Sequence, residues 1–206
     1  MEALLRCTIG GLAFVAAAAF AQQERTSLPA PRHALEGPAL VRALRQGGLT
    51  VYFRHGATHN SQVDREPFDR GDCTKQRNLT DEGRKALRAA ADALVALKAP
   101  IGDVFASPYC RTMESARLLL GRATAADAVL GAMTDGKPDY SALDRMLAAP
   151  PKGQVRIVVG HGHVFRALAG LPYLDEGEAA VLVPVEGRWE IAARLKLGDW
   201  VKLPLS

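Results

Sequence analysis

The 206-residue chain has no lysine- or arginine-rich run, although its net charge is +4. Because its basic residues are spread along the sequence, we expect no nucleic-acid partner. Beyond the first 21 residues no apolar segment reaches membrane length, which argues against a membrane-spanning mature protein. No cluster of His, Asp and Cys has the spacing of metal ligands, so we expect neither a metal nor another cofactor. These absences, with no internal repeat, favour one globular domain.

The first residues have the pattern of a secretory signal. A charged start precedes the apolar run from Ile9 to Phe20, which is too short to span a bilayer comfortably. Ala19 and Ala21 fit the small-residue rule for cleavage. The sequence therefore predicts a signal peptide over 1–21 and an exported protein, periplasmic or secreted; an uncleaved N-terminal anchor is the alternative.

The residues after the predicted cleavage point divide into a leader and a domain. Pro29 and Pro31 interrupt a stretch without apolar periodicity, so we expect a flexible leader over 22–37. Apolar residues at helical spacing begin after Pro38. The folded domain is therefore predicted over 38–206.

Only three cysteines are present, and Cys7 would leave with the signal peptide. In an oxidising compartment we expect Cys73 and Cys110 to form a disulfide, which the chain-entropy model rates at roughly 3 to 4 kcal/mol. Two free thiols are one alternative. A nucleophilic Cys110 activated by the neighbouring Arg111 is another.

Apolar strands alternate with helical patterns along the domain, which predicts an α/β fold. Strands are expected at Leu49–Phe53, Ile101–Ala106 and Val155–Val159, with an antiparallel pair at 179–183 and 189–193 closing the domain. Helices are expected at 39–46, from Thr80 to Ala99, from Ser107 to Leu120 and at 140–148, with Ser107 as the N-cap and Pro108 in the first turn of the third. The polar stretch 57–78 is predicted to be a long functional loop.

Positively charged or imidazole side chains follow three of these strands. Arg54-His55-Gly56 follows the first strand, Arg111 lies shortly after the second, and Gly160-His161 ends the third. If the strands are parallel in one sheet, these groups converge at its carboxyl edge, where ligands bind in open α/β sheets. Two guanidiniums and two imidazoles around one pocket are a poor core and a good receptor for a phosphate group.

This pattern is similar to the histidine phosphatase superfamily, which has the phosphoglycerate mutase-like fold. The resemblance is carried by Arg54-His55-Gly56, by the Ser-Pro-x-x-Arg-Thr segment ending in Arg111 and Thr112, and by Gly160-His161, with Asn78-Leu79-Thr80-x-x-Gly83 before the intermediate helix. It covers the chain from about Leu49 to Trp200. It implies a three-layer α/β/α architecture with a central, mostly parallel sheet.

The resemblance also implies roles for individual residues. His55 would be the nucleophile, neutral, with its second ring nitrogen held by a backbone carbonyl such as that of Gly56. Arg54, Arg111 and His161 would bind the phosphate oxygens as catalytic and substrate-binding groups.

The polar loop after the first motif offers further ligands. We expect Thr58 and Ser61 to be candidate hydrogen-bond donors to the phosphate. His59 and His163 are predicted to shape the rim of the pocket or substrate choice.

The chain departs from the family pattern at the general acid that protonates the leaving group. Gly162 follows His161, where some members have an aspartate. We take Asp135 as the first candidate, with Glu178 and Asp139 as alternatives. Because a general acid contributes about 10²- to 10⁴-fold, its identity bears on which substrates are hydrolysed.

The leading functional hypothesis is an exported phosphomonoesterase that acts through a phosphohistidine on a phosphorylated small molecule. The alternatives are a phosphate-binding protein of the same fold with little turnover and a phosphoprotein phosphatase. A sugar-phosphate mutase fits less well, because the chain is short and carries an export signal. The sequence gives no indication of the oligomeric state.

Overall fold

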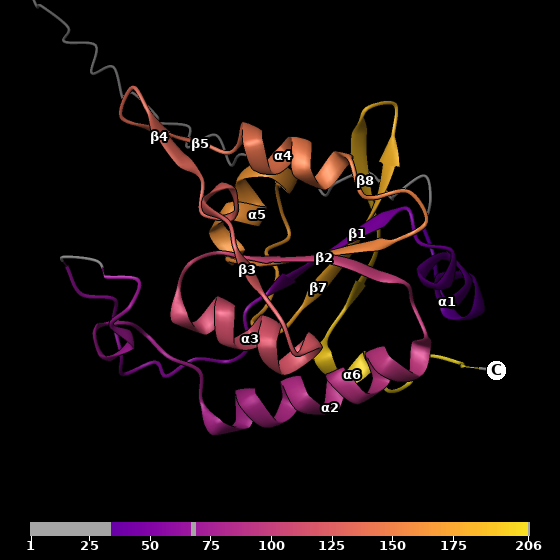
Figure 1. Cartoon of the computed structure of the whole chain (residues 1–206), viewed down its shortest axis with the longest axis horizontal. Helices are drawn as coiled ribbons and strands as arrows, with labels where there is room; N and C mark the ends of the chain where they lie inside the picture. The colour runs from indigo at the N-terminus through magenta and orange to yellow at the C-terminus, as the bar shows by residue number, and fades with distance from the viewer. Residues whose placement is uncertain (1–33, 67–68, 206) are drawn as a thin grey trace, which may run out of the picture.

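A six-stranded, mostly parallel sheet forms the centre of the protein (Figure 1). The computed structural model describes residues 34–66 and 69–205. The strand order is β3-β2-β6-β1-β7-β8, with β3, β2, β6 and β1 parallel and β7 and β8 antiparallel. The strands are β1 (Leu49–Arg54), β2 (Ile101–Ala106), β3 (Thr124–Ala125), β6 (Val155–Gly160), β7 (Ala179–Val185) and β8 (Arg188–Leu195).

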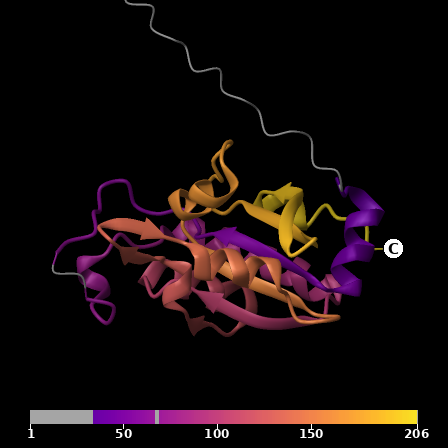
Figure 2. The same cartoon turned by 90° about the horizontal axis from the view of Figure 1, so that it is seen from above.

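Helices cover both faces of the sheet, which confirms the expected α/β architecture (Figures 1 and 2). One buried apolar cluster fills the side of α1, α2, α3 and α6, and a second fills the side of α4 and α5. The helices are α1 (Gly37–Gln46), α2 (Asp81–Leu97), α3 (Cys110–Leu120), α4 (Ser141–Ala148), α5 (Gly162–Ala169) and α6 (Leu197–Trp200), with 3-10 turns at Cys73–Lys75 and Asp127–Val129.

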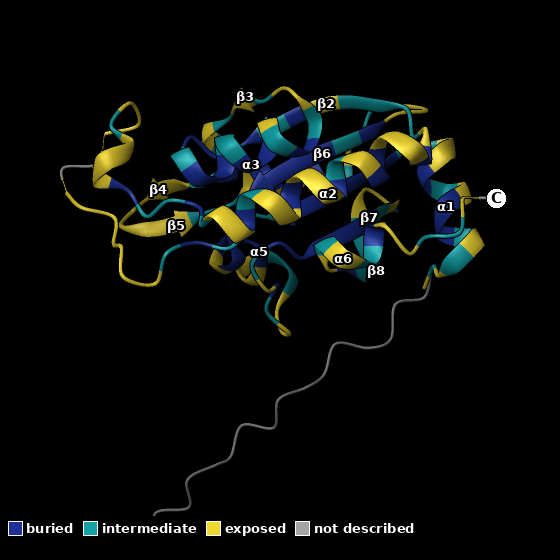
Figure 3. Ribbon diagram, turned by 90° about the horizontal axis from the view of Figure 1, so that it is seen from below, coloured by how far each residue is buried: buried dark blue, intermediate teal, exposed yellow. Residues whose placement is uncertain are grey.

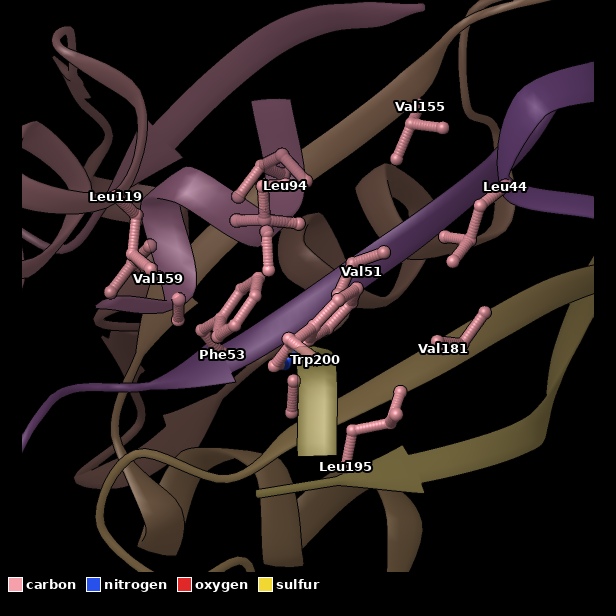
Figure 4. Close-up of a cluster of buried hydrophobic side chains, with 14 of the residues drawn as sticks. Leu44, Val51, Phe53, Leu94, Leu119, Val155, Val159, Val181, Leu195 and Trp200 are labelled. Carbon is pink, nitrogen blue, oxygen red and sulfur yellow. The ribbon is translucent and has the colours of Figure 1, made fainter. Parts of the chain in front are cut away.

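The alternation of side chains along β1 explains the two clusters. Val51 and Phe53 point into the larger cluster, where Phe53 stacks on Trp200 at 5.5 Å between ring centroids (Figure 4). Tyr52 points to the opposite face and packs against Phe165. Since both faces of the central strands are buried, these strands have apolar residues on both sides (Figure 3).

The helices follow the sequence signals for the most part. Thr80 caps α2 as expected, its side chain accepting a hydrogen bond from the Gly83 backbone N–H at 2.9 Å. Gly121 ends α3 in the left-handed conformation at φ 70°. The prediction that Ser107 caps α3 is wrong: the cap residue is Tyr109, and the Ser107 hydroxyl bonds to His161 instead. The short helix α5 was not expected.

The region between α3 and α4 contains a projecting hairpin. Strands β4 (Ala132–Thr134) and β5 (Lys137–Asp139) pair antiparallel and stand away from the main sheet (Figure 1). The sequence there shows no apolar periodicity because most of the hairpin is exposed.

The folded body begins upstream of Pro38. The Leu35 backbone N–H donates to the carbonyl of Ala192 on β8 at 2.8 Å, and the Leu35 side chain packs on the larger apolar cluster. The predicted signal peptide and most of the predicted leader lie outside the described residues. Within 34–66 and 69–205, no helix combines the length and apolar character needed to cross a membrane.

Candidate active site

The carboxyl edge of the parallel strands brings the predicted residues together. Arg54 pairs in register with Gly160, so His55 and His161 follow the same level of two adjacent strands. The His55 and His161 ring centroids are 5.6 Å apart. Ser107 comes directly after β2, and its backbone N–H donates to the Val159 carbonyl. The sheet register therefore determines where both imidazoles lie.

The buried ring of His55 is held in one orientation. Its Nδ1 lies 2.9 Å from the Gly56 carbonyl oxygen, which can only accept, so Nδ1 carries the proton and Nε2 carries the lone pair. Burial lowers the His55 pKa from 6.5 to about 4, and the charges of Arg111 and Arg54 add to this against the opposing effect of the Gly56 hydrogen bond. His55 is thus neutral near pH 7.

His161 is fixed from two sides. Its Nε2 is hydrogen-bonded to Ser107 Oγ at 2.8 Å, and its backbone carbonyl accepts from the Tyr52 hydroxyl at 3.0 Å. Burial lowers its pKa well below 6.5, and the charge of Arg111 lowers it further. The Tyr109 ring meets the His161 ring edge-on at 5.0 Å between centroids, and the His163 ring stacks on it at 5.5 Å. His161 is therefore a neutral, oriented imidazole beside His55.

Arg111 projects from the first turn of α3 and its side chain is only 6% exposed. Its Nη1 and Nη2 donate to the two carboxylate oxygens of Asp64 at 2.9 and 3.1 Å, and Nη1 also donates to the Arg77 carbonyl at 3.3 Å. The Tyr109 ring lies 4.5 Å from the guanidinium carbon. The Arg111 Nε–H is buried and has no partner among the described residues.

Arg54 is held in a similar way from the other side. Its Nη1 donates to the Leu174 carbonyl at 2.7 Å, its Nη2 lies 3.4 Å from a Glu176 carboxylate oxygen, and the Tyr173 ring is 5.4 Å away. Like that of Arg111, its Nε–H is buried without a partner in the described structure. Buried N–H donors of this kind are rare, and an anion between the arginines would satisfy them.

Two predicted phosphate donors have different surroundings. Thr58 is buried and gives both its backbone N–H and its hydroxyl to Glu176, at 2.9 and 2.7 Å. Its hydroxyl proton is therefore already engaged. Ser61 is exposed in the loop turn. The structure thus pairs Thr58 with Glu176 and places Ser61 at the surface, and their binding of phosphate stays a prediction.

Glu176 joins several of these groups. Burial raises its pKa, but the hydrogen bonds from Thr58 and the nearby positive charge of Arg54 outweigh this and hold it below the usual range. Arg77 lies 3.7 Å from the same carboxylate. Glu176 is therefore ionised near pH 7.

Cys73 and Cys110 form the predicted disulfide, with their Cα atoms 5.8 Å apart. The bond attaches the long loop to the first residue of α3, immediately before Arg111. Gln76 reinforces it, because its side-chain oxygen accepts from the Cys110 backbone N–H at 2.8 Å. A Cys110 nucleophile is incompatible with this bond.

The three candidate acids differ in their contacts. Asp135 lies at the exposed turn of the β4–β5 hairpin, with φ at 51°. Asp139 accepts from the Ser141 backbone N–H at the start of α4. Both Glu178 oxygens accept from Arg194, at 2.8 Å each, which makes this carboxylate a structural ion pair. The contacts of Asp139 and Glu178 hold helix and loop ends, and the acid role of Asp135 stays a prediction.

Residues 51–130 match the histidine phosphatase superfamily (branch 1). The matched range contains Arg54, His55 and Arg111, and the fold adds His161 to the same edge. Over this segment the chain is similar to that superfamily, and the match supports a phosphatase as the enzyme class while leaving the substrate undefined. A search of curated proteins found no match.

Solved structures share the fold at low identity. The protein histidine phosphatase SixA complexed with tungstate is 21% identical, with a TM-score of 0.50 over 73% of this chain and 98% of that chain. A mycobacterial glucosyl-3-phosphoglycerate phosphatase with inorganic phosphate is 15% identical, with a TM-score of 0.50 over 73% and 99%. A mutant phosphoserine phosphatase from Entamoeba histolytica with phosphoserine is 12% identical, with a TM-score of 0.51 over 72% and 97%.

Sequence reasoning missed three residues of the site. Ser107 was assigned to a helix cap, although its position directly after a strand is the same signal that identified His55 and His161. Asp64 and Glu176 are separated from their arginines by 47 and 122 positions. No local pattern could have joined those pairs.

Proposed function

We propose that this enzyme hydrolyses a phosphate monoester through a phosphohistidine on His55. The observation that carries the proposal is the Nδ1 hydrogen bond to Gly56, because it leaves the Nε2 lone pair on a neutral ring at the site of the two arginines. A neutral imidazole oriented by a carbonyl is a competent nucleophile.

In the first step, His55 Nε2 forms a bond to phosphorus while the bond from phosphorus to the ester oxygen breaks. The leaving oxygen takes a proton and departs as the alcohol. Water then attacks phosphorus, breaks the N–P bond, and restores His55 with release of inorganic phosphate. Arg54 and Arg111 bind the phosphoryl oxygens, which stabilises the charge that they carry in both transition states.

His161 completes the oxygen-binding set. If the Ser107 hydroxyl donates to its Nε2, the ring proton lies on Nδ1 and is available to a phosphoryl oxygen. The lowered pKa supports a neutral ring in this role. His161 then contributes a directed hydrogen bond without a full positive charge.

The leaving group limits the substrate class. Asp64 and Glu176, the carboxylates in contact with the arginines, both have lowered pKa values and are ionised near neutral pH. They are therefore poorly suited to donate a proton. We assign the acid role to Asp135, which would have to approach the leaving group with the hairpin.

A comparison of two leaving groups tests that assignment. Asp135→Asn should reduce hydrolysis of an alkyl phosphate about 10²-fold or more while sparing p-nitrophenyl phosphate, whose leaving group needs no proton. Asp139→Asn is the matched control. Equal rates of the wild type and Asp135→Asn on the alkyl ester would exclude Asp135 as the acid.

Export is part of the proposal. The apolar run and small residues within 1–21 support it, and so does the disulfide, since such bonds persist in oxidising compartments. Fractionation of cells that express the full chain tests it. A full-length protein retained in the cytoplasm with free thiols would contradict export.

A small phosphorylated molecule is the substrate that the burial of the site favours. His55 is 2% exposed and the Arg111 side chain 6%, so the phosphate group has to reach side chains that are almost fully buried. Release of phosphate from p-nitrophenyl phosphate between pH 4 and 8, compared with His55→Ala, tests the activity. No His55-dependent release at any pH would instead favour a phosphate-binding protein.

A further inference from the structure

Asp64 forms a bidentate ion pair with Arg111, although it belongs to none of the sequence motifs. An arginine has five N–H donors, two on each Nη and one on Nε. The Asp64 carboxylate takes one from Nη1 and one from Nη2, and the Arg77 carbonyl takes the second from Nη1. Three of the five donors are thereby used.

The two donors that remain lie on one edge of the guanidinium. They are the Nε–H, which is buried and unpartnered within the described structure, and the second Nη2–H beside it. Two parallel N–H groups on one edge match two oxygens of a phosphate group. Asp64 thus occupies the Nη1–Nη2 end of the guanidinium, and the Nε–Nη2 edge is left for a ligand.

We propose that Asp64 is a positioning residue for Arg111: by holding the Nη1–Nη2 end, it directs the Nε–Nη2 edge to the phosphate group of the substrate. The proposal rests on the proposed function and assigns a role in it to the loop. A flexible arginine side chain adopts many rotamers, so a fixed carboxylate removes the need to order it when the substrate binds.

The loop is built to hold Asp64 in place. Its Oδ1 also accepts from the Arg77 backbone N–H at 2.9 Å. Arg65 N–H donates to the Lys75 carbonyl at 2.9 Å, and the Asn78 N–H donates to the Gln62 side chain at 2.8 Å. The outgoing and returning halves of the loop are therefore joined on both sides of Asp64.

A carboxylate at this place has a second consequence that can be tested. If Asp64 merely occupied the surface that phosphate needs, its removal would strengthen phosphate binding. If Asp64 orients Arg111, its removal weakens binding even though the site becomes more positive. The sign of the change in phosphate affinity therefore separates a positioning residue from a competitor.

The test measures binding of inorganic phosphate by calorimetry to the full-length wild type, Asp64→Asn and Asp72→Asn. Asparagine has nearly the same shape as Asp64 and keeps an oxygen that accepts from the Arg77 N–H, but it cannot form the bidentate ion pair with Arg111. Asp72 is a matched control, since it lies in the same loop, has similar side-chain exposure (30% against 35%), and pairs with Lys75 and Thr74. Thermal unfolding of each variant checks the fold.

We expect Asp64→Asn to bind phosphate about ten- to a hundredfold more weakly, with a parallel rise in KM for p-nitrophenyl phosphate. Asp72→Asn should match the wild type. Unchanged or tighter phosphate binding by Asp64→Asn would overturn the proposal. An equal loss in both variants would also overturn it, because the effect would then come from the loop as a whole.

The role of Asp64 and the proposed function are tested by different measurements, so either one can be contradicted without the other. Absence of His55-dependent hydrolysis by the wild type counts against the proposed function, whereas calorimetry requires no turnover. Asp64-dependent phosphate binding in a protein without turnover would keep the positioning role and change only the reaction.

Discussion

The two histidines and the two arginines of the site are held in different ways. His55 and His161 are oriented by groups within or next to the sheet, namely the Gly56 carbonyl and Ser107. Arg54 ends strand β1 and Arg111 lies in the first turn of α3, and their guanidiniums contact carboxylates on loops, Glu176 and Asp64. The sheet therefore orients the two imidazoles, while the loops hold the guanidiniums that we propose bind the phosphate.

The largest effect should come from the histidine side. His55→Ala removes the proposed nucleophile, so kcat for p-nitrophenyl phosphate should fall by at least about 10³-fold. Steady-state kinetics measures this, with circular dichroism as the check that the variant is folded. A folded variant that retains a tenth of the activity would show that another group attacks phosphorus.

The next largest effect on activity should come from replacing the Arg111 guanidinium. Arg111→Lys keeps the charge but lacks the planar pair of donors, so kcat/KM should fall about 10²-fold. Arg117→Lys, at an exposed position of the same helix α3, is the control and should behave like the wild type. If Arg111→Lys is as active as the control, a positive charge at this position is enough for activity and the planar pair of N–H donors is not needed.

The pH dependence of kcat/KM should show that the His55 pKa is lower than that of an ordinary imidazole. Because the His55 pKa is lowered to about 4, the ring stays neutral on acidification through 6.5 and protonates only near pH 4. The enzyme's contribution to the acid limb of kcat/KM should then lie near pH 4, after correction for the ionisation of the substrate. An enzyme limb near 6.5 would contradict the buried, neutral His55.

The lowered pKa values of the two histidines should also make the stability of the folded protein depend on pH. The folded-state pKa values of His55 and His161 lie below the unfolded value of 6.5, so the unfolded chain binds more protons between about pH 4 and 6.5. The free energy of unfolding should therefore rise with pH across this window. Urea unfolding at pH 5 and pH 7 measures it, and greater stability at pH 5 would be the contrary result.

A smaller effect is expected from the partner of His161. Ser107→Ala removes the hydroxyl at Nε2, leaving the ring free to turn and a buried nitrogen unpaired, so kcat should fall about tenfold and stability by about 1 to 3 kcal/mol. Ser141→Ala, at the exposed start of α4, is the control. Full activity of Ser107→Ala would mean that His161 needs no orienting group.

The smallest effect on turnover should come from the disulfide. Replacing Cys73 and Cys110 with serine should cost about 4 kcal/mol of stability by the chain-entropy model, while the remaining loop contacts keep Asp64 near Arg111 and limit the loss in kcat/KM to a few-fold. Urea unfolding and kinetics of the double variant measure both. Unchanged stability, or a loss of activity as large as that of Arg111→Lys, would contradict this.

The same contrast explains what could be predicted from the sequence. Strand ends are marked by local apolar runs, so His55 and His161 could be placed at one edge before the fold was known. The hydrogen bond to Gly56 is local as well. Asp64 lies in a loop without periodicity and meets Arg111 only because the chain folds back, which no local pattern records.

Ser107 shows a different reason for error. Serine before proline is a common helix start, and that local preference was outweighed here by a tertiary hydrogen bond to His161. The helix starts later, and Tyr109 takes the cap position. The position of Ser107 directly after a buried strand was the better indicator of its contact with His161.

Trapping the intermediate tests the central claim most directly. Full-length protein mixed with a ³²P-labelled phosphate ester and quenched in denaturant should carry label that is stable to base, labile to acid and located on His55. The label should persist in Cys110→Ser and be absent from His55→Ala. Label on another residue, or turnover without any label on His55, would contradict the phosphohistidine mechanism.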